Sequence, residues 1–587
     1  MTNEAQQLVA KAFFIAAANE DRVLVKKASR HLSSIAEQFG FTFRSLSIGR
    51  FELHLIVEGD LDESALSSDE ISFVVGVLND HPHSWDGFLK VVIEQGVVVV
   101  ENDYAGSIPL FYSSRGGLSL SNIEPCVYLA TNTSYKDISY ENLYGFLRYS
   151  HFIWNETAWQ HVFQMLPDGR CSFSAQGTLL EEKYLATVKA NTDRASYTDK
   201  QVAQELFELN EHLVKRALTD SDSIVLPLSS GYDSRMIFAV LANDKSLRDK
   251  TSCYTYGPEG SIEVEAARRL ANQNSVAWQH IELPCQFLNK DYLQKIGDIF
   301  GASLHMHGMY QLEFFDELKK LPSLQDRFTL TSGFMTGVPA GQHNGLLGLH
   351  SNDASLSAAM DRFSQSQVWT KAELQALQAF SDPSFEATAE ARFQQAFDRF
   401  EGELYQKSVM FDVWTRQRNF ISYYPRTFTW LCPVASPHMC TDHVNFFMSL
   451  SEKHLQDRHA VELMFAAHYP KIARIGSNSN GLKAINSVLE SFLLFVSRVM
   501  SRFNFGSLLP LRYRNEPSEY DLQAVMNGGK DSVYPLLHNN VAVQSLAQLM
   551  GGGDVFDNLY SGAESGDMRD YAKLITLQAV AMDLVLE

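Results

Sequence analysis

Residues 224–240 read IVLPLSSGYDSRMIFAV, and this stretch decides the fold of the central part of the chain. The apolar run from Ser223 to Leu228 predicts a short buried strand, and apolar residues from Met236 to Ala242 predict the start of a helix. Strand, tight turn and helix in this order are typical of a nucleotide-binding α/β unit. The flanking sequence continues the pattern, with a helix over 201–220, a strand over 253–258, a helix over 262–272 and a strand over 277–282. We therefore expect a parallel sheet.

The turn between this strand and helix is built from small and polar residues, namely Ser229, Ser230, Gly231, Tyr232, Asp233 and Ser234. Small side chains let the backbone approach a phosphate closely, and the N–H groups at a helix start favour anionic oxygens. Asp233 adds a carboxylate, which suits a phosphate site only if a divalent cation such as Mg²⁺ balances the negative charge. The alternative is a turn whose Ser and Asp residues only cap the helix, and the spacing alone leaves both interpretations open.

The same turn resembles the SGGxDS loop of the ATP pyrophosphatase superfamily, in particular its asparagine synthetase branch. The likeness continues in YTYGPEGSIEVEAARRLANQ, residues 254–273, and in the segment over 416–455, where the family pattern is R-x-PFLD-x-x-L-x-x-F-x-x-SLP. The resemblance implies a doubly wound parallel-sheet ATP pyrophosphatase domain over 200–480, followed by a helical C-terminal region over 481–587. It also implies ATP and Mg²⁺ as cofactors, with Asp233 as a metal ligand.

The first region, 1–188, is rich in predicted strands: AFFIAA from Ala12, FELHLIVEG, FLKVVIEQGVVVVEND and CSFSAQGTL, with a hairpin turn at Gln95-Gly96. Residues 87–122 and 165–184 resemble the class II glutamine amidotransferase domain that is fused to these synthetases. The positions that match its hairpin are Asp103, Gly106, Pro109 and Tyr112. The resemblance implies an Ntn-hydrolase-like αββα sandwich.

The chain departs from the family at the residues that carry two of its activities. A class II glutaminase needs cysteine as residue 2, and here residue 2 is Thr. We therefore expect no glutaminase activity, as in the β-lactam synthetases and lasso-peptide cyclases that this chain resembles. The second metal carboxylate of the family, in a loop like SGDGxDE, aligns with Gly337 in TSGFMTGVPAGQHNG. Asp353, or phosphate oxygens and water, would have to replace it.

Four further residues are candidates for catalysis. Arg458 takes the place of the lysine that stabilises the acyl-adenylate transition state in the family, and it keeps the charge without lending a proton. Its alternative role is a structural ion pair. Lys483 could be a cation that binds phosphate, or a loop lysine exposed to solvent. Glu263 and Glu265 could approach the acceptor substrate, or they could lie on the exposed face of the first turn of a helix. His305, His307 and His343 could bind a metal or simply pack in the interior.

Composition excludes several other classes of protein. The 587 residues carry 49 Lys and Arg against 69 Asp and Glu, a net charge of −20, which disfavours nucleic acid as a partner. The six cysteines form no CxxC pair, which indicates neither a zinc ribbon nor a disulfide framework and predicts a cytoplasmic protein. We expect no export signal and no membrane span, and we interpret the apolar segment 491–514 as a packed helix rather than a membrane-surface helix.

Together these features predict an ATP-dependent ligase that forms amide bonds through an acyl-adenylate and releases pyrophosphate. The carboxylate substrate would be a small molecule, a peptide or a sugar. The amine would be ammonia, an amino compound or a group on the same substrate. The alternative is a synthetase-like scaffold or regulator that has lost catalysis. Either protein could work as a homodimer or in a biosynthetic complex.

Overall fold

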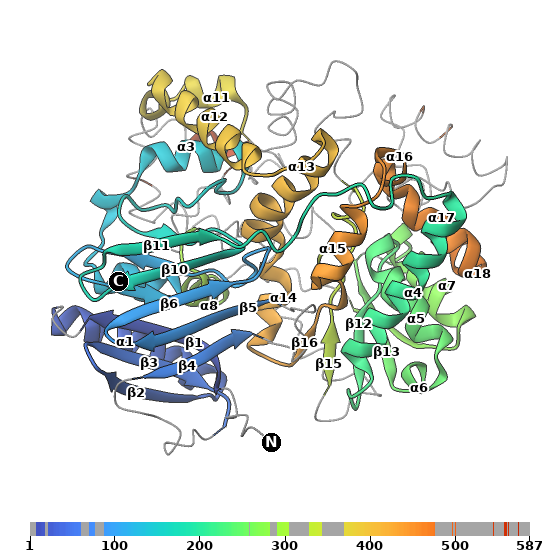
Figure 1. Ribbon diagram of the computed structural model, residues 1–587, viewed down its shortest axis with the longest axis horizontal. Helices are drawn as coiled ribbons and strands as arrows, with labels where there is room; N and C mark the ends of the chain where they lie inside the picture. Colours follow the sequence, from blue (N-terminus) through green and yellow to red (C-terminus); the bar gives the residue numbers. More distant parts are fainter. Residues whose placement is uncertain are drawn as a thin grey trace.

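The computed structural model describes residues 8–17, 21–59, 70–76, 87–257, 259–281, 290–303, 328–342 and 369–475, with a few isolated positions beyond them. Several sequence predictions concern residues outside the described ranges: Thr2, His305, His307, His343, Asp353, Lys483 and nearly all of 491–514. The described chain forms two sheets, a large curled mixed sheet and a smaller parallel one, with helices packed on both (Figure 1). The mixed α/β class is therefore confirmed.

The first sheet contains eleven strands in the order β11-β10-β6-β5-β4-β1-β8-β7-β9, with β3 pairing β1 and β2 pairing β3. The strands are β1 (Leu8–Ala17), β2 (Thr42–Ile48), β3 (Phe51–Val57), β4 (Ile71–Gly76), β5 (Phe88–Glu94), β6 (Val97–Asn102), β7 (Phe111–Ser113), β8 (Ser119–Ser121), β9 (Phe163–Gln164), β10 (Gly169–Ser174) and β11 (Leu179–Tyr184). Strand β1 connects the two halves of the sheet, because its first residues pair with β4 in parallel and its last residues pair with β8 in an antiparallel arrangement. All other neighbours in this sheet are antiparallel.

The strand predictions for this region are confirmed, with one correction at the start of β1. The strand begins at Leu8, four residues before the predicted Ala12. Lys11 interrupts the apolar run in the sequence, but its side chain leaves the strand to reach the carbonyl of Thr429 and the carboxylate of Glu58. The turn at Gln95-Gly96 is confirmed, because φ is 50° at Gln95 and 76° at Gly96, as a tight hairpin turn requires.

The curled sheet packs one face on itself and the other face on helices. Its inner core joins strands from distant parts of the chain, including Phe13 of β1, Phe73 of β4 and Phe173 of β10. On the other face lies α1 (Arg22–Phe39), a helix that the sequence reasoning missed, together with α2 (Glu124–Ala130). Asp21 caps α1 by accepting from Val23 N–H, and Gly40 ends it at φ 72°.

The second sheet has five strands in the order β14-β13-β12-β15-β16, and every neighbouring pair is parallel, as predicted. The strands are β12 (Ile224–Pro227), β13 (Thr251–Tyr256), β14 (Ala277–Ile281), β15 (Thr329–Thr331) and β16 (Val434–Ala435). The helices of this region include α4 (Asp199–Leu218), α5 (Tyr232–Asn243), α6 (Lys245–Arg248), α7 (Ile262–Gln273) and α8 (Lys290–Phe300). Because the strands are parallel, the segments that follow β12, β15 and β16 meet at one edge of the sheet.

Residues 369–475 are mostly helical. The elements are α11 (Lys371–Gln375), α12 (Pro383–Asp398), α13 (Leu404–Asp412), a π-helix η5 (Val413–Ile421), α14 (Tyr423–Thr429), α15 (Thr441–Phe447), α16 (Glu452–Leu455), α17 (His459–His468) and α18 (Pro470–Ala473), with short 3₁₀ turns between some of them. Prolines mark the starts of three of these elements, since Pro425 lies in the first turn of α14 and Pro437 and Pro470 each begin a new element. In Figure 1, α13 and α14 lie between the two sheets.

Candidate functional site

The predicted phosphate loop connects β12 to α5, and its residues alternate between the interior and the surface. Ser230, Tyr232 and Ser234 are buried, whereas Ser229, Gly231 and Asp233 are half-buried. Three hydrogen bonds inside the loop fix its shape: Ser229 N–H donates to Ser234 Oγ at 3.0 Å, Gly231 N–H donates to Ser229 Oγ at 3.1 Å, and the hydroxyls of Ser229 and Ser234 are 2.9 Å apart. Gly231 is the N-cap of α5, so no side chain caps this helix start. The accessible half of the loop therefore borders the positive end of α5.

Glu263 belongs to the buried side of this loop. Its carboxylate accepts a hydrogen bond from Ser230 N–H, and both residues are almost fully buried. Glu263 lies in the first turn of α7, whose N-cap Ser261 accepts from Val264 N–H. A carboxylate at this position is favoured by the helix dipole and by the hydrogen bond from the loop. Glu263 thus fixes the backbone of the loop, while Glu265 faces outward and pairs with Arg268.

The segment that follows β15, residues 332–342, packs against Asp233 through two glycines. A Cβ atom added to Gly333 would lie 3.1 Å from the Cβ of Asp233, and one added to Gly337 would overlap the carboxylate of Asp233 and the amide of Gln342. Residue 337 therefore stands beside Asp233, where the sequence alignment places the second metal carboxylate. The absence of a side chain at 337 lets the two segments approach this closely.

A chain of buried hydrogen bonds holds the segment 332–342 in this place. Asn210 of α4 donates to the carbonyl of Met236, so its side-chain oxygen is free to accept from His438 Nε2–H at 2.8 Å. The other nitrogen of His438 then accepts from Thr336 Oγ–H at 2.7 Å. Burial holds the pKa of His438 well below its usual range, so the ring is neutral. A neutral imidazole can donate through one ring nitrogen and accept through the other.

His443 supports Thr336 from the other side. Its Nε2–H donates to the carbonyl of Thr336 at 3.2 Å, and burial lowers the pKa of His443 to about 4. The sequence reasoning considered other histidines and missed this pair. Both histidines lie in the segment SPHMCTDH, which directly follows the short strand β16 at the edge of the parallel sheet.

Arg458 lies next to the loop, as the last residue of the 3₁₀ turn η7 (Gln456–Arg458) and the N-cap of α17. Its guanidinium carbon is 4.9 Å from the centre of the Tyr232 ring, and the Tyr232 hydroxyl donates to Glu462 at 3.3 Å. The side chain is buried, and its Nε atom has no hydrogen-bond partner among the described residues. Asp457 and Arg458 both have positive φ, 50° and 62°, a conformation that costs roughly 1–2 kcal/mol per residue. The backbone is thus bent so that a buried cation faces an aromatic ring of the loop.

The side chains near the loop fit an anion better than they fit a protein-bound metal cluster. Within the described part of the chain, no three His, Cys, Asp or Glu side chains gather as a metal site. Asp233 provides a carboxylate at the half-buried side of the loop, and Mg²⁺ accepts such a site when phosphate oxygens and water complete its shell. Arg235, the residue after the loop, points away and donates to the carbonyl of Ile475 at 2.6 Å.

The predicted site residues are therefore brought together in part. Ser229–Ser234, Glu263 and Arg458 surround one loop, whereas Lys483 lies outside the described residues. None of the helices among the described residues combines the length and apolar character of a membrane span. The chain matches no family in a scan of protein-family models, and no curated protein matches it.

Proposed function

We propose that this protein is an ATP-dependent ligase that forms amide bonds and belongs to the asparagine synthetase type. The observation that carries the proposal is the loop 229–234, whose half-buried residues Ser229, Gly231 and Asp233 lie at the start of α5 and whose buried Tyr232 ring contacts the cation of Arg458. A polyanion is the ligand that a helix start and a buried guanidinium favour together. The proposal includes an Ntn-hydrolase-like first region and an ATP pyrophosphatase-like second region, which agree with the two sheets.

The proposed reaction has two steps. A carboxylate oxygen of the substrate attacks the α-phosphorus of ATP, and the bond to the β-phosphate breaks, which gives an acyl-adenylate and pyrophosphate. An amine nitrogen then attacks the acyl carbon, loses a proton to solvent, and displaces AMP. Ser229, Gly231 and the first turn of α5 would hold the pyrophosphate, and Arg458 would stabilise the negative charge that develops at the reacting centre. Mg²⁺ would neutralise phosphate charge, with Asp233 as its protein ligand.

The amine source is external to the protein in this proposal. Residue 2 is Thr rather than Cys, so we infer that the first region delivers no ammonia from glutamine. The five cysteines in the described part of the chain are buried and free, which suits a reducing compartment such as the cytoplasm. Lys483 remains a proposed phosphate cation, and the substrate remains a small, peptide or sugar carboxylate.

The experiment measures pyrophosphate release from ATP and Mg²⁺ with a panel of carboxylates, with and without ammonium. We expect release by the wild-type protein and a loss of at least about 100-fold in Asp233→Ala, as is typical when a group that stabilises phosphate charge is removed. Asp222→Ala is the matched control, because Asp222 is an exposed acid just before β12. Equal release by Asp233→Ala and Asp222→Ala would rule out the mechanism.

One observation favours the second candidate, a scaffold or regulator without catalysis. Gly337 stands where the family has its second metal carboxylate, and no side chain fits there beside Asp233 in the present arrangement. A scaffold of this kind would gain no stability from ATP and Mg²⁺. If the protein binds the nucleotide, a free nucleotide concentration of 100 times the dissociation constant would instead stabilise the folded protein by about 2.7 kcal/mol.

A further inference from the structure

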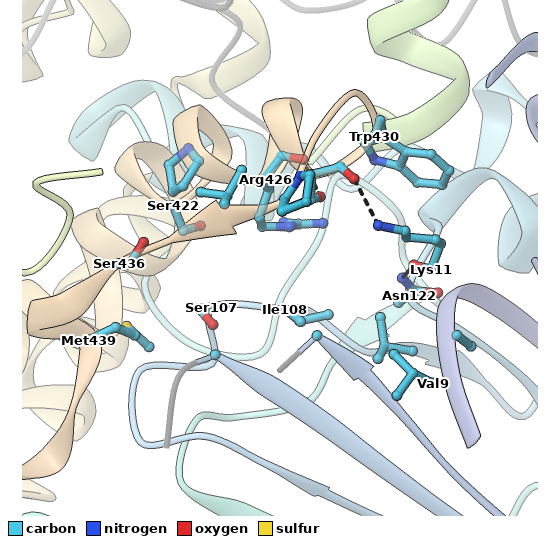
Figure 2. Close-up of a pocket in the computed structure, with 18 of the residues that line it drawn as sticks. Val9, Lys11, Ser107, Ile108, Asn122, Ser422, Arg426, Trp430, Ser436 and Met439 are labelled. Atoms are coloured by element: carbon cyan, nitrogen blue, oxygen red, sulfur yellow. Dashed lines mark hydrogen bonds between the residues drawn. The ribbon is translucent and has the colours of Figure 1, made fainter. Parts of the chain in front are cut away.

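A cavity of about 530 Å³ lies between the curled sheet and the segment that runs from α14 to η6 (Pro437–Met439) (Figure 2). One wall comes from β1, the end of β4 and the turn that contains Ser107 and Ile108. The other wall comes from α14, β16 and the adjoining residues, with Phe334 of the segment 332–342. A volume of this size is typical of a site for a small organic molecule. The cavity is separate from the loop 229–234, none of whose residues lines it.

Most of the lining is apolar, and several polar groups in it are already used. Ile108, Ile123, Phe334, Trp430 and Met439 form apolar parts of the wall. The side-chain oxygen of Asn122 accepts from Phe13 N–H and its amide donates to the carbonyl of Lys11, while Ser107 Oγ donates to Asp103. These groups stabilise the protein itself, so they do not define a ligand.

Arg426 is the exception among the polar groups. Its guanidinium lies against two rings, 4.7 Å from the centre of Tyr423 and 5.3 Å from the centre of Phe300. Its Nη1 atom is buried and has no hydrogen-bond partner among the described residues. Figure 2 shows the guanidinium reaching from α14 toward the wall formed by Ser107 and Ile108. A buried N–H donor that carries part of a positive charge is expensive to leave without an acceptor.

Lys11 supplies a second cation at the other end of the cavity. Its ammonium donates to the carbonyl of Thr429 at 3.3 Å and pairs with Glu58 at 3.2 Å. The side chain of Glu58 is 73% exposed, so water weakens its hold on Lys11. Behind the wall, Asp103 faces Arg426, and burial raises the pKa of Asp103 to about 6, which leaves it mostly ionised at pH 7. Among the residues that line the cavity, the two cations Lys11 and Arg426 outnumber the acid Glu58, and the rest of the wall is mostly apolar.

We propose that this cavity binds a small monocarboxylate with an apolar body, whose carboxylate accepts from Arg426 Nη1–H and whose body packs against Trp430, Phe334 and Met439. The ammonium of Lys11 attracts the same charge from the opposite wall. A cationic or neutral molecule of the same shape would fill the apolar volume but would leave the Arg426 donor without an acceptor. Charge complementarity thus selects the ligand class. The proposal does not depend on ATP chemistry at the loop 229–234.

The test uses 4-phenylbutyrate as the probe, with 4-phenylbutyramide and 4-phenylbutylamine as molecules of nearly the same shape. Binding to the full chain is followed by ligand-observed NMR and calorimetry. We expect 4-phenylbutyrate to bind at least about tenfold more tightly than the amide, since a hydrogen bond to a charged group is worth more than a neutral one. Equal binding of acid and amide, or no binding of the acid at millimolar concentration, would overturn the proposal.

Variants then locate the binding. Arg426→Gln should weaken the binding of 4-phenylbutyrate at least about tenfold and leave the binding of the amide unchanged. Arg170→Gln, at an exposed arginine of β10, should change neither. If Arg426→Gln does not fold, Arg426→Lys and Lys11→Gln carry the test, and each should weaken the acid selectively. Unchanged binding of the acid in a folded Arg426→Gln or Lys11→Gln protein would show that the probe binds elsewhere and would contradict the proposal.

Discussion

The two sheets place their acidic side chains in different ways. In the curled sheet region, the carboxylate of Asp103 accepts from Phe88 N–H, Ala105 N–H and Ser107, and that of Glu124 accepts from Ala302 N–H and Ser303 N–H. Both are enclosed, and burial raises the pKa of Asp103 to about 6 and that of Glu124 to about 7. These acids hold segments of the protein together.

Beside the parallel sheet, the acids instead surround a loop with an accessible half. Glu263 fixes the loop from the buried side, and Asp233 stands at its half-buried side between α5 and the segment 332–342. The comparison teaches that Asp103 and Glu124 are enclosed and link segments of the first region, whereas Asp233 beside the parallel sheet is only half-buried. We expect mutations in the two regions to separate stability from activity accordingly.

The largest expected effect is on stability, from Glu124→Ala. This change leaves Ala302 N–H and Ser303 N–H without their acceptor and opens a hole between α2 and the end of α8. We expect a loss of about 3–5 kcal/mol in the free energy of unfolding, measured with urea. Glu124→Gln, which keeps an acceptor oxygen, should lose less than half as much. A stable Glu124→Ala protein that has lost ATP turnover would break the comparison, because it would make Glu124 a functional acid.

The next effect concerns Gly337→Asp, which restores a carboxylate at the family position. The new side chain must displace Asp233 or Gln342, and we expect it to lower stability by roughly 1–3 kcal/mol in the presence of EDTA. If Asp233 binds Mg²⁺, then Mg²⁺ with ATP should recover part of this loss. Gly337→Asn is the control, with almost the same volume and no added charge. Equal recovery of both variants by Mg²⁺ would contradict a metal site at Asp233.

The third prediction concerns pH. Burial lowers the pKa of His443 from 6.5 to about 4, so below pH 6.5 the unfolded chain binds a proton that the folded chain does not. The contribution of His443 is therefore complete above pH 6.5 and is lost as the pH falls toward 4, at about 1.4 kcal/mol per pH unit.

Replacing this histidine should therefore make the protein less sensitive to acid. Between pH 4.5 and 6, we expect the free energy of unfolding of His443→Asn to change with pH by about 1.4 kcal/mol per pH unit less than that of the wild-type protein. Urea titrations at several pH values measure this slope. His212→Asn, on α4, is the control. Glu124 works in the opposite direction, because its pKa is raised and its contribution is lost as pH rises toward 7. An unchanged slope in His443→Asn would show that the ring is protonated in the folded protein.

The smallest expected effect is that of Glu263→Gln. The amide oxygen can still accept from Ser230 N–H, but the charge is lost, so we expect stability to fall by about 1 kcal/mol. Pyrophosphate release should weaken through a higher KM for ATP, with kcat little changed, because Glu263 positions the loop from behind. Glu265→Gln, two residues along the same helix and paired with Arg268, should change neither value. A large fall in kcat alone would place Glu263 at the reacting atoms.

Much of the second region could be predicted from the sequence because its signals are local. The strand before Ser229 and the helix after Gly231 follow directly from apolar spacing, and the position of Gly337 beside Asp233 agrees with the alignment of the two loops. The buried contacts could not be predicted in the same way. His438 meets Thr336 and Asn210 across more than 100 residues of chain, and no local pattern marks such a pairing.

The first region was predicted less completely for two physical reasons. The start of β1 was not recognised because Lys11 interrupts its apolar pattern. A long charged side chain can extend away from a strand that is otherwise buried, as Lys11 does. The helix α1 was missed because its buried residues, such as Val25 and Leu32, are separated by charged and polar ones at a spacing that had to be read as helical. The cavity between the two regions also lay beyond the sequence, since its walls come from strands and helices far apart in the chain.

The most direct test of the central claim is the thermal unfolding of the protein with Mg²⁺ and a non-hydrolysable ATP analogue, which requires no knowledge of the carboxylate. We predict stabilisation of the wild-type protein and of Asp222→Ala, by about 2.7 kcal/mol at 100 times the dissociation constant, and a much smaller effect on Asp233→Ala. The same stabilisation of all three proteins, or none in the wild type at millimolar nucleotide, would contradict a nucleotide site at the loop 229–234.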